Sequence, residues 1–258
     1  MLKIKNLNVV FNRGSAMEKK ALTQVNLTID DGDFVSVIGS NGAGKSTLLN
    51  AIFGLVKITS GSICLNGRDI TKLPSYKRAK KIGILFQNPL LGTAPDMTIE
   101  ENLVLASAKI EHKPFSLALT AKNRAQLVKD LETLDIGLEK RLRTNVGLLS
   151  GGQRQALTLL MATSAQPDLL LLDEHTAALD PQTAIKIMEK TAAIVAEKKL
   201  TTLMITHNVQ NAIDYGNKLL LMDGGKIIRI IAGEEKKRLT LSDIMQLYQN
   251  NLSDKMIL

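Results

Sequence analysis

Residues 39–46 read Gly39-Ser40-Asn41-Gly42-Ala43-Gly44-Lys45-Ser46, and this stretch decides the fold. It fits the pattern Gly-x-x-x-x-Gly-Lys-Ser/Thr, in which backbone N–H groups surround a di- or triphosphate. The lysine of such a loop reaches the terminal phosphates, and the serine hydroxyl is available to Mg²⁺. The pattern predicts that a nucleoside phosphate binds along the loop from Gly39 to Thr47.

The segments around this loop occur in the order that the motif requires. Residues 34–38 form a β-type apolar run that leads into it, residues 45–53 read as a helix, and Gly54 follows the helix end. Two further β-type runs, residues 2–11 and 21–29, precede these and are separated from them by turn-forming clusters. The order strand, loop and helix therefore supports the interpretation of residues 39–46 as a phosphate loop.

In the rest of the chain the predicted secondary structure changes twice, first to helices and then to alternating strands and helices. After short strands at residues 62–65 and 82–86, residues 88–165 read mainly as helices, at 98–107, 116–134 and 151–164. Strands at 169–172, 201–206 and 218–222 then alternate with helices that begin near Pro181 and Val209, as parallel sheets require. A strand at 226–231 and a helix through Tyr248 end the chain.

We therefore expect an α/β fold whose core has a mainly parallel sheet, with an N-terminal antiparallel β subdomain and an inserted α-helical subdomain. The whole chain, residues 1–258, is expected to form a single domain. Residues 1–87 and 166–258 would make up the nucleotide-binding core with its β subdomain, and residues 88–165 the helical subdomain.

Composition limits the possible functions. The chain has 258 residues, 45% of them hydrophobic, and no stretch approaches the eighteen or so apolar residues of a membrane-spanning helix. One cysteine excludes an internal disulfide, and the absence of a second thiol beside only three histidines argues against a zinc site. The net charge of +8 suits a nucleic-acid surface or a protein that binds polyphosphate near anionic lipids. Because Trp is absent and aromatic residues make up only 3%, we expect no nucleic-acid partner.

A second glycine-containing motif reads Leu149-Ser150-Gly151-Gly152-Gln153. Ser150 is a good N-cap, and an apolar helix continues after it. The glycines leave the first backbone N–H groups open, and the helix dipole favours a negative charge there. The motif predicts an anion site, and a serine-capped Gly-Gly turn is the alternative.

Two carboxylates, Asp173 and Glu174, directly follow the apolar run at residues 169–172. Open α/β sheets bind ligands at this end of their strands. We expect Asp173 to hold Mg²⁺ through water and Glu174 to polarise a water aimed at the terminal phosphate. A strand that ends in solvated acids is the alternative interpretation.

Three other residues stand at strand ends. His207 follows residues 201–206 and could hydrogen-bond a γ-phosphate or the attacking water, although it could equally cap a helix. Gln87 ends the run at 82–86, and Phe11 ends the first strand, where it could stack on adenine or pack in the core.

Taken together, these segments resemble ABC-type ATPases over the full chain, in the order of residues 39–47, Gln87, residues 149–153, Asp173-Glu174, Ala178-Leu179-Asp180 and His207. The resemblance implies a P-loop NTPase core, ATP and Mg²⁺ as cofactors, and an ATPase activity. It also assigns a role to every candidate residue. The expected nucleotide-binding residues are Phe11, Gly39, Ser40, Asn41, Gly42, Ala43, Gly44, Lys45, Ser46, Thr47, Ser150, Gly151, Gly152, Gln153 and Asp180.

The same resemblance implies the reaction and its symmetry. Glu174 is expected to be the catalytic base, His207 the switch histidine, and Gln87 a sensor of water and Mg²⁺, with Ser46 and Asp173 as the other metal-binding residues. Two chains would pair head to tail as an ATP-bound homodimer. The helix at Ser150 of one chain would then cap the γ-phosphate held by Lys45 of the other, and Asp180 would lie in a loop that contacts the partner.

A narrower resemblance rests on residues 173–181, Thr206-His207-Asn208 and Asp214-Tyr215-Gly216-Asn217. These are similar to the ATPase subunits of bacterial uptake systems that have a receptor lipoprotein and a separate permease and are linked to tryptophan or other aromatic amino acids. It implies an importer subunit on the cytoplasmic face of the cell membrane. Its integral membrane permease would contact Leu90, Leu91 and Met97, and the substrate-binding lipoprotein would be an indirect partner. A soluble ABC-type ATPase of iron–sulfur cluster assembly and an exporter subunit remain alternatives.

Overall fold

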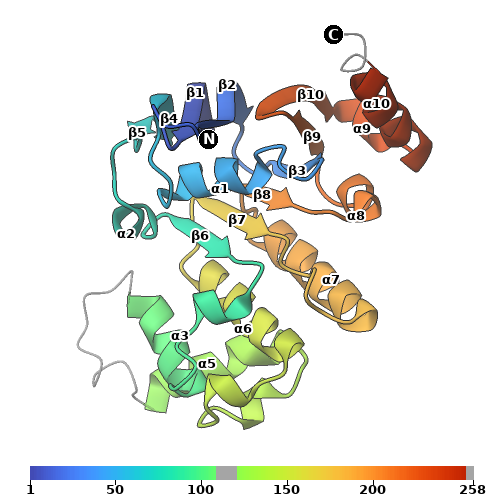
Figure 1. Cartoon of the computed structure of the whole chain (residues 1–258). Coiled ribbons are helices and arrows are strands. Elements are labelled where there is room, and N and C mark those ends of the chain that lie inside the picture. Colours follow the sequence, from blue (N-terminus) through green and yellow to red (C-terminus); the bar gives the residue numbers. More distant parts are fainter. Residues whose placement is uncertain (109–120, 254–258) are drawn as a thin grey trace.

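The computed structural model describes residues 1–108 and 121–253, whose strands form two sheets (Figure 1). The first sheet is antiparallel, has the order β2-β1-β4-β5, and consists of β1 (Leu2–Phe11), β2 (Lys19–Ile29), β4 (Ser60–Leu65) and β5 (Arg68–Asp69). The second has the order β10-β9-β3-β8-β7-β6. Its parallel strands are β3 (Phe34–Gly39), β6 (Ile82–Leu85), β7 (Leu169–Asp173), β8 (Thr202–Ile205) and β9 (Lys218–Asp223). The strand β10 (Lys226–Ala232) runs antiparallel at one edge.

Some helices cover the second sheet, and others form the segment between β6 and β7. Those of the core are α1 (Lys45–Phe53), α2 (Ser75–Arg78), α7 (Pro181–Glu197), α8 (Val209–Asp214), α9 (Gly233–Lys237) and α10 (Leu241–Ser253). Between β6 and β7 lie η1 (Pro89–Gly92), α3 (Ile99–Ala108), α5 (Ala121–Glu132), η2 (Leu138–Lys140), η3 (Val146–Leu148) and α6 (Gly151–Ser164).

The apolar run of β7 shows how the layers form. Leu169 and Leu171 join one buried cluster with side chains of α1 and of the antiparallel sheet, whereas Leu170 and Leu172 join a second cluster with side chains of α6 and α7. Successive side chains of a strand point to opposite faces, so four consecutive leucines fill both layers. Helix α1 thus lies between the two sheets, and α6 and α7 cover the other face (Figure 1).

The segment between β6 and β7 has an apolar core of its own. Side chains of α3, α5, α6 and the turns between them bury this cluster, for example Leu103, Leu131, Val146 and Leu157. Ile187 of α7 also belongs to it and so links this segment to the sheet. Within the described residues the segment contains helices and turns, with only an isolated bridge between Thr98 and Asn145.

The predicted fold class is confirmed, since a mainly parallel sheet, an antiparallel N-terminal sheet and helices all form. The expected helices at 45–53 and 151–164 have the observed bounds, but the expected helix at 116–134 ends at Glu132, and residues 116–120 lie outside the described residues. The sequence pattern does not predict β5, α2 or α9. They have two, four and five residues, too few for a periodic apolar pattern.

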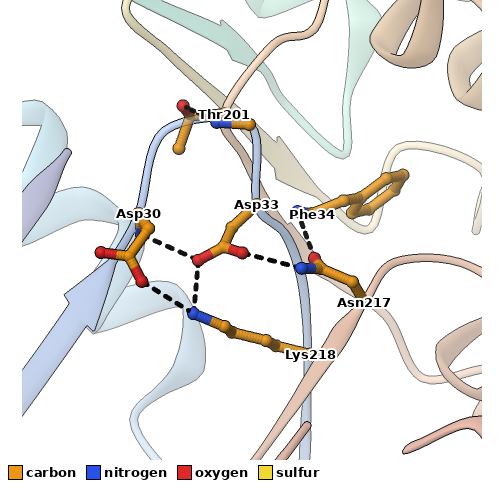
Figure 2. Close-up of polar contacts among 7 residues, drawn as sticks. Asp30, Asp33, Phe34, Thr201, Asn217 and Lys218 are labelled. Carbon is orange, nitrogen blue, oxygen red and sulfur yellow. Dashed lines mark hydrogen bonds and ion pairs between the residues drawn. The ribbon is translucent and has the colours of Figure 1, made fainter. Parts of the chain in front are cut away.

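A cluster of polar side chains joins the amino ends of the parallel strands (Figure 2). The carboxylate of Asp33, one residue before β3, accepts hydrogen bonds from Lys218 Nζ at 2.5 Å, Asn217 Nδ2 at 2.7 Å and the Asp30 backbone N–H at 2.8 Å. Asn217 Oδ1 accepts the N–H of Phe34 at 2.8 Å. The cluster therefore fixes the starts of β3 and β9 at the edge of the sheet opposite Gly39 and Asp173.

Candidate functional site

The predicted phosphate loop connects β3 to α1, and its lysine is held inside it. Lys45 is buried, and its Nζ donates hydrogen bonds to the carbonyl oxygens of Gly39 at 2.8 Å and Ser40 at 3.0 Å. Burial lowers the pKa of Lys45, and the nearby charges of Glu174 and Asp173 offset part of this effect. The loop thus presents a preoriented ammonium group beside the N-terminus of α1, where anions bind favourably.

Two glycines make the path of this loop possible. A Cβ atom on Gly39 would lie 2.2 Å from the carbonyl oxygen of Met222 in β9. Gly44 has φ +95°, and a Cβ atom there would lie 2.6 Å from the carbonyl oxygen of Ala21 in β2. The loop therefore packs against both sheets, and a side chain at either position would displace it.

The metal-binding candidates Ser46 and Asp173 lie beside each other. The Ser46 hydroxyl donates to Asp173 Oδ1 at 3.4 Å, which joins the start of α1 to the carboxyl end of β7. Burial and then the charge of Glu174 raise the pKa of Asp173, against the lowering effects of Ser46, His207 and Lys45. Mg²⁺ usually takes one or two protein oxygen ligands together with phosphates and waters, and this hydroxyl and carboxylate fit that requirement.

Glu174 and His207 face each other across the ends of β7 and β8. Glu174 Oε1 contacts Nε2 of His207, and the carboxylate side chain is only 9% exposed whereas the imidazole is 48% exposed. The Glu174 backbone N–H donates to the Ile205 carbonyl at 3.0 Å, while its φ of 47° lies in the left-handed region. Such a conformation is uncommon for a residue with a side chain and is often found at functional sites.

A cleft of about 300 Å³ brings most of the predicted nucleotide-binding residues together. Its lining includes Phe11, residues 41–47, Glu174 and His207. Phe11 is 38% exposed at the end of β1, so its ring is available for stacking. Lys19 and Ala21 of β2 also line the cleft, and sequence reasoning missed both. No local pattern marks them, because only the pairing of Phe11 with Lys19 brings β2 to this place.

The second motif begins α6 as a capped helix. The Ser150 hydroxyl accepts the N–H of Gln153 at 3.3 Å, and the Gln153 side chain accepts the N–H of Ser150 at 3.2 Å. This reciprocal arrangement is a capping box and confirms the predicted N-cap. The Ser150 and Gln153 N–H groups are thus satisfied within the first turn of α6. The other N–H groups of this turn face outward from the N-terminal end of the helix.

Helix α7 starts next to this turn. Asp180 caps α7 by accepting the N–H of Thr183 at 3.1 Å, and hydrogen bonds from the Thr183 side chain and then from the Thr183 backbone lower the pKa of Asp180. A Cβ atom on Gly152 would lie 2.3 Å from Cγ2 of Thr183. The structure therefore brings the loop that contains Asp180 against the start of α6.

The candidates fall into two groups in space. The lining of the nucleotide cleft does not include Ser150, Gly151, Gly152, Gln153, Asp180 or Gln87 among the residues that the structure describes. Gln87 follows β6 at the same edge of the sheet as Asp173 and is exposed. One chain thus provides one half of the expected site next to Lys45 and the other half elsewhere on its surface.

A separate groove of about 380 Å³ lies between the sheet and the helical segment. Phe53, Phe86, Leu91, Thr158 and Met161 contribute to its lining. Leu91 of η1 is 68% exposed and Leu90 is 43% exposed, whereas Met97 is half-buried. Of the three residues expected to contact a permease, Leu91 lines this groove and the other two do not.

Comparison with known proteins agrees with this geometry. The family model for ABC transporters matches residues 22–177. The tyrosine transport ATP-binding protein of Clostridioides difficile is 45% identical over 249 residues, which cover 96% of this chain and 99% of that protein. A phosphonates import ATP-binding protein of Lactococcus lactis is 34% identical over 88% of this chain and 92% of its own length.

Comparison with solved structures also identifies ATP-binding cassettes. The dimeric ATP-binding cassette MJ0796 in a post-hydrolysis state with ADP and Pi superimposes with a TM-score of 0.77, at 29% identity, over 90% of this chain and 98% of its own. Within the described ranges, no helix has both the length and the hydropathy needed to cross a bilayer. The matched family model and the full-length relative together show that the chain belongs to the ABC transporter family, as an ATP-binding subunit with ATPase activity.

Proposed function

We propose that this chain drives a bacterial-type importer for an aromatic amino acid, with tyrosine as the first cargo to test. The observation that carries this proposal is the 45% identity with a tyrosine transport ATP-binding protein, which extends over nearly the whole length of both chains. Other relatives are named for the import of phosphonates and methionine, at 34% and 36% identity. The cargo proposal therefore follows the relative with the higher identity and the fuller coverage.

The proposed reaction assigns a task to the main residues of the cleft and to Asp173 and Gln87, which lie at the ends of neighbouring strands at the same edge of the sheet. Lys45 and the loop N–H groups bind the β- and γ-phosphates, and Phe11 stacks on the adenine. Ser46, Asp173 and Gln87 hold Mg²⁺, which when bound neutralises charge on the phosphates. Glu174 then polarises the attacking water, and His207 orients this water and the γ-phosphate. The contact between Glu174 and His207 supports this pairing, since it keeps both side chains at the edge of the cleft.

The proposed active form is a head-to-tail homodimer. Ser150, Gly151, Gly152, Gln153 and Asp180 lie outside the cleft lined by Lys45, so a second copy is needed to bring such residues to the phosphates. The N-terminus of α6 has an exposed glycine, Gly151, and the dipole for that task. A solved relative, the cassette MJ0796, is described as dimeric.

The proposed location is the cytoplasmic face of the cell membrane, beside an integral permease. The groove lined by Leu91 is mainly apolar, and its lining residues Phe86 and Leu91 flank Gln87 in the sequence. Both properties support this groove as the site for a permease helix. A substrate-binding lipoprotein would act only through the permease. In this assembly residues 88–165 serve as the helical subdomain that carries the groove, and residues 1–87 and 166–258 serve as the nucleotide-binding core.

The decisive experiment is transport by a reconstituted complex. The chain is purified with its permease, placed in proteoliposomes with the substrate-binding protein, and supplied with Mg-ATP while labelled tyrosine, tryptophan, phenylalanine and methionine are compared. ATP-dependent uptake of an aromatic amino acid, absent with the Glu174→Gln chain, supports the proposal. Uptake of methionine instead overturns the cargo, and a chain that co-purifies with no permease from membranes overturns the transport role.

A further inference from the structure

The positive charge of this chain is concentrated in one segment. Residues 57–81 contain seven basic residues and one acidic residue, a net charge of +6, whereas the whole chain carries +8. Six of the seven basic side chains are exposed. We call these six residues, Lys57, Arg68, Lys72, Lys77, Lys80 and Lys81, the basic face.

The seventh basic residue builds the support for this face. Arg78 of α2 is buried, and its guanidinium donates to the carbonyl oxygens of Ala51 and Ile52 at the end of α1, at 2.8 and 2.7 Å. It also donates to the carbonyl oxygens of Thr71 at 2.9 Å and Leu73 at 2.8 Å. Arg78 thus fixes α2 and the loop before it against α1, so that the neighbouring exposed lysines share a rigid base.

The basic face borders the groove proposed for the permease. Lys80 lines the groove that contains Leu91, while Lys77 and Lys81 line an adjoining hollow with Arg68, and Lys57 and Lys72 line a third hollow next to Leu73 and Arg78. The three hollows share the walls formed by residues 73–82. Figure 1 shows α2 and β5 together at one side of the molecule, on the opposite side from α7 and α8.

Apolar and aromatic side chains accompany these charges. Tyr76, on α2 beside Lys77, is 68% exposed, and Leu55, near Lys57, is 52% exposed. Tyrosine and leucine side chains interleaved with lysines are typical of surfaces that rest in the headgroup region of a bilayer. Among the described residues, Asp69 follows Arg68 and its charge acts on Lys72, and Asp168 lies 3.6 Å from Lys81.

We propose that the basic face binds anionic phospholipid headgroups and holds the chain against the bilayer next to its permease. The inference extends the proposed function, because a subunit docked on a permease is kept near a membrane surface. A bilayer fits these observations better than an acidic protein loop, since five of the six cations are lysines spread over three hollows, and Asp69 and Asp168 are the carboxylates that the described residues place beside them. Flexible ammonium groups suit a diffuse layer of phosphates, whereas planar arginine pairs suit a defined protein carboxylate.

The test uses the purified chain and vesicles without permease. Sedimentation is compared for vesicles of phosphatidylcholine alone and of equal parts phosphatidylcholine and phosphatidylglycerol. The triple variant Lys57→Gln, Lys72→Gln, Lys77→Gln avoids the groove, and the control triple Lys129→Gln, Lys140→Gln, Lys186→Gln changes the net charge equally at exposed lysines elsewhere. The first triple should weaken binding to phosphatidylglycerol vesicles by about a hundredfold, with little change for the control. A similar loss in both triples, or no binding by the unchanged chain, overturns the proposal.

A fluorescence experiment tests the orientation independently. The chain has no tryptophan, so Tyr76→Trp places a single reporter on the basic face and Ile185→Trp places one on α7. The emission of the first should shift to the blue with phosphatidylglycerol vesicles, and that of the second should not. The opposite pattern overturns the proposal. If vesicle binding fails while the first triple loses binding to purified permease, the face recognises an acidic protein surface. Normal uptake of amino acid together with failed vesicle binding rejects only the lipid contact, not the proposed function.

Discussion

The Nε2 atom of His175 lies 3.1 Å from the hydroxyl oxygen of Thr191, and both side chains are buried. The Thr191 hydroxyl donates its own hydrogen to the carbonyl oxygen of Ile187 at 2.7 Å, so it accepts the Nε2–H of the imidazole. Burial lowers the pKa of His175 to about 4, which keeps the ring neutral near pH 7. This hydrogen bond ties the residue after Glu174 to the middle of α7.

Thr191→Val should therefore destabilise the protein, because it leaves a buried N–H group without an acceptor. The expected loss is about 1–3 kcal/mol, which thermal unfolding would show as a fall of several degrees in Tm. Thr163→Val is the matched control, since that buried hydroxyl donates only to carbonyl oxygens of its own helix. Equal effects of the two substitutions would contradict the assigned role of the His175 bond.

Asp33→Asn should lower stability and alter its dependence on acid. Burial raises the pKa of Asp33, but Lys218, Asn217 and the Asp30 N–H together hold it below its ordinary value. Because the folded pKa lies below that of the unfolded chain, the carboxylate contributes stability above about pH 4, and this contribution is lost as the pH falls further. Urea unfolding should show a loss of about 1–2 kcal/mol at pH 7 that shrinks in acid.

Asp30→Asn provides the control for the Asp33 experiment. Asp30 reaches the same Lys218 ammonium at 3.2 Å, but its side chain is 63% exposed. An exposed pair contributes less than about 1 kcal/mol, so this variant should unfold close to the unchanged protein. A larger effect at Asp30 than at Asp33 would show that burial does not decide the strength of these contacts.

Glu174→Gln should still bind Mg-ATP but hydrolyse it about 10²- to 10⁴-fold more slowly, the usual contribution of a general base. The amide keeps the size of the side chain while losing its basicity. Phosphate release and the binding of a fluorescent ATP analogue measure the two properties, with the exposed Glu189→Gln of α7 as control. Gel filtration with Mg-ATP should show a dimer, and a variant that remains monomeric would speak against the head-to-tail arrangement.

Gly151→Asp should slow hydrolysis strongly without disturbing the fold. The nearest atom to a Cβ on Gly151 is a methyl carbon of Leu179 at 3.5 Å, so a side chain fits there, in contrast to Gly152 with Thr183 at 2.3 Å. A carboxylate would then face the γ-phosphate of the second copy, and such a like-charge contact should lower turnover by about 100-fold. Gly151→Asn has the same shape without the charge. If both variants hydrolyse ATP equally well, the start of α6 does not complete the site.

Leu91→Asp should prevent docking to the permease while ATP binding by the isolated chain is retained, because Leu91 lines the groove and not the nucleotide cleft. A charge at the centre of an apolar contact should weaken co-purification with the permease by at least about 30-fold. Leu241→Asp on α10, where the leucine is 43% exposed, controls for a surface charge. Normal recovery of the complex with Leu91→Asp would place the docking surface elsewhere.

Sequence reasoning was most successful where a local rule applied. The phosphate loop, the Ser150 cap and the strand before Asp173 each depend on a few adjacent residues, and the loop, cap and strand all formed as expected. The β-hairpin that brings Lys19 into the cleft depends on the register between β1 and β2, which contains bulges and which no short pattern encodes. The same limit applies to the Asp33 cluster, whose members come from residues near positions 30 and 217.

The spatial separation of the candidate residues also lay beyond local patterns. Phe11, Lys45 and Glu174 are far apart in sequence and meet in one cleft, whereas Gly151 and Asp180 are nearer to Glu174 in sequence but lie outside its lining. Chain distance therefore gave no indication of which residues share a site within one copy. The packing of α6 against α7, at Gly152 and Thr183, places Gly151 and Asp180 next to each other.

Helix α6 has a consequence for how the two surfaces communicate. Its first turn carries Ser150 and Gly151, and its later turns place Thr158, Met161 and Ala162 in the groove beside Leu91. A helix of 14 residues is about 21 Å long and transmits displacement along its axis almost without bending. When the first turn is drawn toward a bound phosphate, the far end moves with it. In the proposed dimer, closure around the nucleotide would therefore change the shape of the groove.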